Sequence, residues 1–167
     1  PGLLIEGMIT AGYAVGACRG IIYLRAEYRW LLPKLHAAIE MYEHMGWIGA
    51  DAPTKEPFRF DIRIQIGAGS YVCGEETALM ASIMGLRGEP RPRPPFPSVK
   101  GVWGKPTNNN NVETYANIPQ IILNGADWYA SMGTERSKGT KTFAVGGNVA
   151  KPGLIEEPMG ITLRENI

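Results

Sequence analysis

The sequence predicts an α/β fold with a mainly parallel sheet. Segments with helical periodicity alternate with short strand-like runs before a stretch rich in Gly, Ser and Thr at Gly133–Gly139. One of these runs is apolar and β-branched, which is typical of a parallel strand covered on both faces. The 167 residues include 21 Gly and 13 Pro, and 44% of them are hydrophobic. We therefore expect many tight turns within a fold that still has a core.

The first element is expected to be a buried helix over Leu3–Val15. Its apolar residues recur at helical spacing and nearly encircle the helix, which indicates burial on most sides. Gly7, Gly12 and Gly16 lower the intrinsic helix propensity of this segment. We expect these glycines to let a neighbouring strand or helix pack closely.

Two strands and a second helix are expected next. The apolar run is Gly20–Arg25, and Pro33 suits the first turn of a helix that ends at Gly46. A turn over Asp51–Pro57 leads to Phe58–Ile66, where apolar and polar residues alternate. This period of two predicts a strand with one buried face.

The middle of the chain combines helices with a long loop. A helix over Glu75–Met84 is followed by Gly85–Thr107, which holds six prolines. Loops of this length are uncommon in compact domains, so this one is either a linker or a functional wall. Val112–Leu123 has helical character, although Pro119 would kink or interrupt a helix there.

The character of the sequence changes at Gly133–Gly139, where we expect a domain boundary. Lys141–Val145 and Gly153–Glu156 are predicted to form the strands of a hairpin. Thr162–Glu165 is typical of an N-cap and the first turn of a helix.

Charge and cysteine content exclude several classes of protein. The chain has 17 basic and 16 acidic residues, so no overall field draws it toward nucleic acid or an anionic membrane. No apolar run reaches the roughly 18 residues of a membrane span. Cys18 and Cys73 match no metal or disulfide spacing. We expect no nucleic-acid partner, no metal ligands and no direct membrane insertion.

The most informative stretch for function is Ile66–Ala78, where a strand, a glycine-rich turn and a helix N-terminus follow one another. Glycines let a ligand touch the backbone, and the free N–H groups of a helix start favour an anion such as phosphate. The spacing matches neither the dinucleotide fingerprint nor a P-loop. A plain strand-to-helix turn is the alternative.

Two carboxylates begin that helix. Glu75 and Glu76 are either an ordinary acidic first turn or acceptors for ribose or ribityl hydroxyls. Adjacent residues of a helix point in different directions, so a facing pair for hydrolysis is not expected.

Two further segments suit a nucleotide. Asn108–Asn111 is either a turn or a set of amides that bind a polar ring edge or a phosphate. Arg91–Pro97 is either a solvated polyproline segment or a stiff wall that holds a cation and an aromatic ring. His36 and His44 are expected at the surface, and no Ser/His/Asp or Cys/His arrangement stands out.

Together these segments resemble the NADH-oxidising flavoprotein subunit of respiratory complex I. The same family includes the diaphorase subunits of NAD-linked hydrogenases and of NAD-dependent formate dehydrogenases. The five blocks that carry the resemblance are, in order, Leu4–Met8, Gly67–Ala78, Arg93–Pro97, Gly104–Thr107 and Asn110–Thr114.

The resemblance implies a domain organisation. Residues 1–135 would be the C-terminal part of a Rossmann-like FMN- and NADH-binding domain, and residues 136–167 the beginning of a β-grasp domain. The glycine-rich loop for the FMN phosphate would lie upstream of Pro1, and the cysteine motif of a 4Fe–4S cluster beyond Ile167. We therefore expect an internal fragment that is inactive and does not bind FMN tightly by itself.

The resemblance also implies roles for individual residues. Glu76 would accept hydrogen bonds from the hydroxyls of the nicotinamide ribose, and Phe96 would stack on the adenine ring. The residues that would line the flavin are Tyr71, Gly74 and Glu75. The residues that would bind its phosphate and ribityl side are Asn110, Asn111 and Thr114, with Asn109 alongside. Arg93 stands where many relatives have Lys, which leaves the preference between NAD and NADP open.

The implied activity is that of an NADH:acceptor oxidoreductase. Hydride would pass from nicotinamide C4 to flavin N5 without a catalytic acid or base from this chain, because the protein positions the two cofactors. Electrons would leave through iron–sulfur clusters to a quinone or hydrogenase partner. The expected partners include a small thioredoxin-like iron–sulfur subunit, in the cytoplasm or on the cytoplasmic face of a membrane complex (in a eukaryote, the mitochondrial matrix).

Two alternative interpretations stay open. The Gly67–Glu76 turn would also suit a Rossmann-like module that binds a nucleotide without redox chemistry. The proline-rich segment would also suit an interaction domain that docks a partner.

Overall fold

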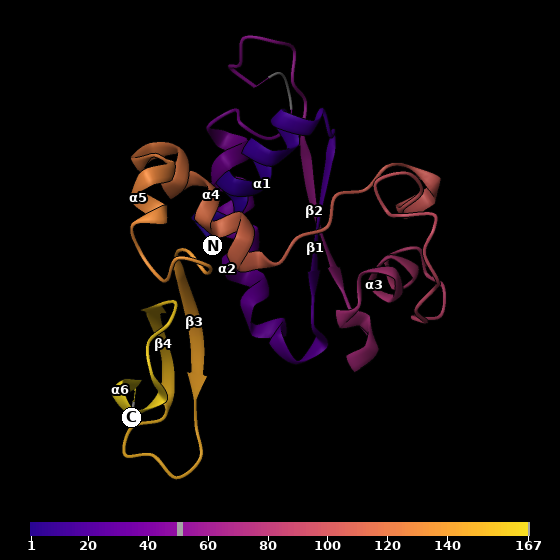
Figure 1. Cartoon of the computed structure of the whole chain (residues 1–167). Helices are drawn as coiled ribbons and strands as arrows, with labels where there is room; N and C mark the ends of the chain where they lie inside the picture. Colours follow the sequence, from indigo (N-terminus) through magenta and orange to yellow (C-terminus); the bar gives the residue numbers. More distant parts are fainter. Residues whose placement is uncertain (50–51, 167) are drawn as a thin grey trace. The chain divides into compact units, whose positions relative to one another are not determined.

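The computed structural model describes residues 1–49 and 52–166. They fall into two compact units, Pro1–Asn117 and Ile118–Ile167, which we call unit 1 and unit 2. Figure 1 follows both along the chain. The limit between the units lies inside a helix, whereas the sequence places a domain boundary at residue 135. The two units are defined by contacts within the chain and not by homology to known domains, so the domain boundary at residue 135 stays a prediction.

Unit 1 is built on two parallel strands, β1 (Arg19–Leu24) and β2 (Asp61–Ile66). Their register runs from Arg19 opposite Asp61 to Leu24 opposite Ile66. A parallel pair needs a long crossover, and this one carries helix α2 (Leu32–His44), preceded by the short 3₁₀ helix η1 (Ala26–Leu31). The expected α/β character is confirmed at this level.

The second strand begins three residues later than its alternating pattern predicts. The carbonyl groups of Phe58 and Phe60 accept hydrogen bonds from Ala52 and Gly49, at 3.0 and 2.9 Å, rather than from β1. Both phenyl rings are buried and stack on each other, with centroids 5.7 Å apart. The pattern therefore marked the burial of this segment correctly but not its pairing. The turn predicted at Asp51–Pro57 begins outside the described residues.

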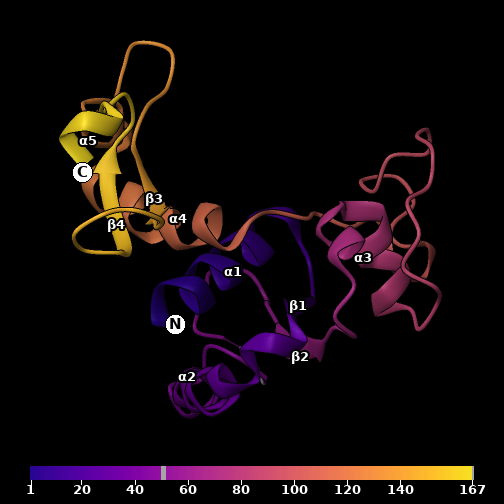
Figure 2. The ribbon, with the colours of Figure 1, turned by 90° about the horizontal axis from the view of Figure 1, so that it is seen from below.

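Helices cover both faces of this small sheet. Helices α1 (Gly2–Val15) and α2 lie on one face and α3 (Glu76–Ile83) lies on the other, as Figures 1 and 2 show from two directions. The smaller apolar cluster joins α3 to the 3₁₀ helix η3 (Val102–Gly104) through Met80, Ile83 and Val102. The larger cluster consists of Leu4, Ile5, Met8, Ile9, Ile22, Leu24, Leu35, Ala38, Ile39, Ile48, Ala52, Phe58 and Phe60.

The glycines of α1 confirm close packing at two of three positions. A Cβ atom at Gly7 would lie 1.9 Å from the carbonyl oxygen of Tyr115, and one at Gly12 would lie 2.7 Å from the Phe60 ring. Gly16 instead ends the helix in the left-handed conformation, with φ of 69°.

Helix α4 (Val112–Asn124) continues through Pro119 instead of being interrupted there. Proline has no N–H for the carbonyl four residues earlier, which is that of Tyr115. This is the same carbonyl that approaches Gly7, so close contact with α1 surrounds the group that Pro119 leaves without its usual donor.

Unit 2 contains the predicted hairpin. Strands β3 (Thr140–Val145) and β4 (Gly153–Pro158) pair in antiparallel fashion, after the short helix α5 (Ala126–Ala130). The predicted helix start is confirmed as α6 (Leu163–Asn166). Its capping box is complete, because Thr162 N donates to Glu165 Oε2 at 2.9 Å and Glu165 N donates to Thr162 Oγ1 at 3.4 Å.

Of the helices in the two described ranges, none combines the length and the apolar character that a membrane crossing requires.

Candidate nucleotide-binding site

The glycine-rich turn leaves the sheet at the carboxyl end of β2, where open α/β sheets bind ligands. Gly67 N donates to Leu24 O at 2.8 Å, so the turn stays attached to β1 for one more residue. A Cβ atom at Gly67 would lie 2.6 Å from the Tyr23 hydroxyl, and Gly69 has a φ of 89°. These two positions need glycine, one for space and the other for its conformation.

The next residues form the 3₁₀ helix η2 (Tyr71–Gly74), which presents two predicted site residues to the surface. The Tyr71 side chain is 92% exposed. A Cβ atom at Gly74 would meet nothing within 4 Å, so the backbone there is open to a ligand. An exposed ring beside bare backbone suits the flat face of a heterocycle.

Glu75 is the N-cap of α3. Its Oε2 accepts hydrogen bonds from Thr77 N at 2.9 Å and Ala78 N at 3.0 Å, and also from the Thr77 hydroxyl. The Thr77 hydroxyl is the main cause that holds the pKa of Glu75 below its usual range, with smaller contributions from the two backbone N–H groups and from Arg93. Two of the N–H groups that we expected to attract a phosphate, those of Thr77 and Ala78, are therefore already occupied by the Glu75 carboxylate.

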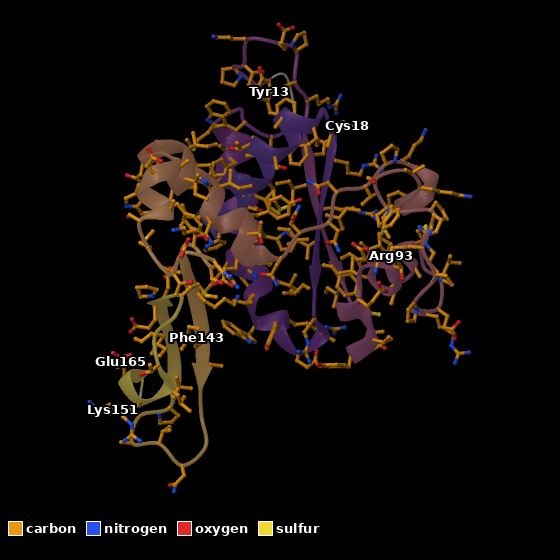
Figure 3. The ribbon with its side chains drawn as sticks, in the orientation of Figure 1. Tyr13, Cys18, Arg93, Phe143, Lys151 and Glu165 are labelled. Carbon is orange, nitrogen blue, oxygen red and sulfur yellow. The ribbon has the colours of Figure 1, made fainter. Side chains whose placement is uncertain are left out.

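Glu76 points away from Glu75 and pairs with Arg93, through Arg93 Nη1 and Glu76 Oε1. The Arg93 guanidinium carbon also lies 6.0 Å from the centroid of the Phe96 ring. Figure 3 shows Arg93 beside α3. The two carboxylates do not form a facing pair, as their adjacent positions predicted.

The proline-rich segment is tied to α3 at a second point. Arg91 N donates to the hydroxyl of the buried Thr77 at 2.9 Å, and Arg91 Nη2 donates to Lys100 O at 2.5 Å. Thr107 N closes the loop by donating to Pro97 O at 2.9 Å. These contacts favour the stiff wall over the solvated polyproline segment.

The asparagine run is partly satisfied by itself. Asn110 Nδ2 donates to Asn108 Oδ1 at 3.0 Å and to the Tyr115 hydroxyl at 3.4 Å, while Asn111 Oδ1 accepts from Glu113 N at 2.9 Å. This pattern is typical of a turn that starts a helix, here α4. All four amides are exposed, as is the predicted residue Thr114.

The predicted site residues thus fall into two groups within unit 1. One gathers at the start of α3 and consists of Tyr71, Gly74, Glu75, Glu76, Arg93 and Phe96. The other gathers at the start of α4 and consists of Asn109, Asn110, Asn111 and Thr114. The segment between η3 and α4 passes from the layer of α3 across the sheet to that of α1, which links the groups (Figures 1 and 2). That they share one cofactor stays a prediction.

Two residues of this region were not predicted. Thr77 is 2% exposed and joins Glu75 to Arg91, and its place two residues after an N-cap carboxylate is a signal that could have identified it. Trp103 has a φ of 49° and faces the guanidinium groups of Arg63 and Arg19, at 4.8 and 5.9 Å from its ring centroid. We find no sequence signal for that cluster.

Comparison with known proteins identifies the family. The Nuo51 FMN-binding domain family matches residues 1–120. The chain belongs to this family. The predicted relationship to complex I flavoprotein subunits and hydrogenase diaphorase subunits is therefore confirmed.

Several relatives match nearly the whole chain. The NADP-reducing hydrogenase subunit HndC of Solidesulfovibrio fructosivorans is 53% identical over 167 residues, which are 100% of this chain and 34% of that protein. An NADH-quinone oxidoreductase subunit of Escherichia coli is 45% identical over 99% of this chain and 37% of its own length. The chain thus spans about a third of these relatives.

A solved structure is similar in fold as well. The crystal structure of an NAD⁺-reducing [NiFe]-hydrogenase in the H₂-reduced state has a chain that is 46% identical, with a TM-score of 0.89. The match covers 99% of this chain and 28% of that one.

Proposed function

We propose that this chain is part of an NADH-oxidising flavoprotein that binds FMN and a nicotinamide dinucleotide. The observation that carries the proposal is the match to the Nuo51 FMN-binding domain family over residues 1–120. The relatives from NADH-quinone oxidoreductases and from an NAD-reducing hydrogenase support the same activity.

The residues at the start of α3 fit the ring of FMN better than its phosphate. Tyr71 and Gly74 offer an exposed ring and open backbone against which a flat heterocycle can lie. Glu75 already occupies the N–H groups of Thr77 and Ala78, so the phosphate would bind elsewhere. The exposed amides of Asn109, Asn110 and Asn111 can both donate to and accept from the ribityl chain.

Bound FMN would supply the acceptor atom N5 for a hydride from nicotinamide C4. The chain's own task is to hold the two rings within about 3–3.5 Å of each other. Arg93 and Phe96 form a wall beside α3 that would orient the dinucleotide, with its adenine ring stacked on Phe96. No side chain here has to move a proton.

The wider setting belongs to the same proposal. These relatives are subunits of larger assemblies, so we propose that this protein also works as a subunit, with an iron–sulfur protein receiving its electrons. Residues 1–135 would be Rossmann-like and residues 136–167 would begin a β-grasp domain. Other subunits would select the quinone or hydrogenase acceptor.

Gly74→Val in the intact protein tests the proposal. A Cβ atom at this position would meet nothing within 4 Å, so we expect folding to be unchanged, but the valine side chain would occupy the space given to the flavin. We expect FMN affinity to fall about tenfold or more, measured by flavin absorbance after dialysis. The matched control is Gly153→Val, at the start of β4, where a Cβ atom also meets nothing within 4 Å.

The wild-type protein supplies the decisive readout. Bound yellow flavin that NADH bleaches supports the proposal. A protein that binds nucleotide without flavin, or whose flavin NADH leaves oxidised, would instead be the non-redox module.

A further inference from the structure

The glycine-rich turn between β2 and α3 is held at two buried residues, Gly67 and Cys73 (Figure 1). Residues 68–72 between them are exposed, and they include Tyr71, which is proposed to line the flavin. The position of such a short stretch is set by whatever holds its two ends. The contacts of Gly67 and Cys73 therefore decide where the turn presents Tyr71 to a ligand.

Tyr23 on β1 packs against the first of these residues. A Cβ atom at Gly67 would lie 2.6 Å from the Tyr23 hydroxyl oxygen and 2.9 Å from its ring carbon Cζ, so the phenol lies directly on the glycine backbone. Tyr23 is opposite Gln65 in the register of the parallel strands. Gly67 follows Gln65 by two residues, which brings it to the face of the sheet on which the Tyr23 side chain lies.

The same hydroxyl reaches α3 and the second buried residue. The hydroxyl groups of Tyr23 and Ser82 share a hydrogen bond of 2.9 Å, although these residues are 59 positions apart in sequence. A Cβ atom at Gly88 would lie 2.6 Å from Cys73 Sγ and 3.9 Å from Ser82 Cβ, so the thiol lies beside that bond. Burial is the main cause that raises the pKa of Tyr23; the hydrogen bond with Ser82 opposes the rise, and the Cys73 thiol adds to it.

We infer that Tyr23 is a positioning residue for the flavin, because it holds the Gly67–Gly74 turn in the conformation that presents Tyr71 and Gly74 to the ring. This inference rests on the proposed function and deepens it, since it names what fixes the surface that faces the flavin. Tyr23 does not itself have to touch the cofactor. Its ring holds one end of the turn, and its hydroxyl couples the turn to α3.

Tyr23→Phe in the intact protein tests this role. The variant keeps the ring on Gly67 but removes the hydrogen bond with Ser82, so the turn has to be ordered when the flavin binds. We expect the FMN dissociation constant to rise about 3- to 10-fold in a fluorescence titration. The visible circular dichroism of the bound flavin should also weaken, because it reports how rigidly the ring is held.

A second variant tests whether the effect passes through α3. Ser82→Ala removes the other partner of the same hydrogen bond and should raise the FMN dissociation constant by a similar factor. The double variant should bind FMN within about twofold of the weaker single variant, because both substitutions remove one interaction. Effects that multiply would overturn the coupling between Tyr23 and Ser82.

The matched control is Tyr42→Phe. Tyr42 is also half-buried in unit 1, and its hydroxyl donates to Gly2 O at 3.4 Å from α2, on the face of the sheet opposite α3. Burial is the main cause that raises its pKa as well. Tyr42→Phe should leave FMN affinity and flavin circular dichroism unchanged, and urea denaturation checks that both tyrosine variants are folded.

The outcomes separate the two proposals. FMN affinity and flavin circular dichroism that are the same in Tyr23→Phe and wild type would overturn the role of Tyr23 and leave the proposed function standing. Equal losses of FMN affinity in Tyr23→Phe and Tyr42→Phe would also overturn that role, because they would reflect a general loosening of unit 1. Wild-type protein that binds no FMN would overturn the proposed function itself.

Discussion

The two units obtain their order in different ways. Unit 1 has two apolar clusters, and its Ile5 and Met80 side chains are 0% and 1% exposed. Among the described residues of unit 2, those that are buried are Pro119 and Gly139. Unit 2 instead leaves an open apolar groove of about 310 Å³, lined among others by Phe143, which Figure 3 labels.

This difference shows what each unit depends on. The hairpin of unit 2 is held by backbone pairing between β3 and β4 and by local caps, and a single hairpin is marginally stable at best. The candidate site is in unit 1, where helices pack on both faces of the strands. Substitutions should therefore act unequally in the two units.

The largest effect is expected from truncating the core of unit 1. Ile5→Ala should lower the free energy of unfolding by about 2–5 kcal/mol, because it opens a cavity at a fully buried position. The counterpart in unit 2 is Leu154→Ala, at a side chain that is 76% exposed, and it should change that free energy by less than about 0.5 kcal/mol. Urea denaturation measures both, and equal effects would refute the contrast.

A smaller effect is expected where α1 meets α4. Gly7→Ala would place Cβ 1.9 Å from the Tyr115 carbonyl oxygen, and the resulting overpacking should cost about 1–3 kcal/mol of unfolding free energy. Gly2→Ala in the same helix is the control, because its Cβ would lie 3.8 Å from its nearest neighbour, the Tyr42 hydroxyl. A thermal denaturation in which both variants match wild type would show that α1 is not held at Gly7.

The smallest effect concerns the caps of α3 and α6, one in each unit. Hydrogen bonds from threonine hydroxyls are the main cause that lowers the pKa of both Glu75 and Glu165. A lowered pKa means that the folded state favours the carboxylate, so each cap is complete above the unfolded value of about 4.3 and is lost as pH falls through the folded value.

Amide hydrogen exchange should show this loss directly. We expect protection of the Thr77 and Ala78 amides to be constant above about pH 4.3 and to fall at lower pH, as the pH passes through the lowered pKa of Glu75. Glu75→Gln should remove that pH dependence. Glu89→Gln, which alters an exposed ion pair with Arg87, is the control and should leave it unchanged. Protection of these two amides in wild type that is no greater than in Glu75→Gln at neutral pH would contradict the cap.

Local patterns in the sequence identified most helices and strands correctly. The burial of α1, the parallel strand after it and the hairpin of unit 2 follow from periodicity. The misjudged elements depend on distant partners. The carbonyl groups of Phe58 and Phe60 accept hydrogen bonds from Ala52 and Gly49 instead of from β1. Helix α4 continues through Pro119, and the Tyr115 carbonyl that lacks its usual donor there lies against Gly7.

The candidate site divides along the same line. The glycine-rich turn and the family relationship could be predicted, because they depend on residue types in a fixed order. The role of Glu75 as the cap of α3, with its carboxylate on the N–H groups of Thr77 and Ala78, could not be predicted. The residues around it in the sequence are equally compatible with a helix start whose N–H groups are free.

The sequence by itself determined the fold class, the family and the kinds of side chain at the candidate site. The fold class follows from short-range pattern, and the family follows from a resemblance that residues in a fixed order carry. The tertiary structure alone decided that Arg93 pairs with Glu76 and lies over Phe96. That pairing depends on how a proline-rich loop folds back onto α3, through contacts at Thr77 and Lys100 that no local periodicity encodes.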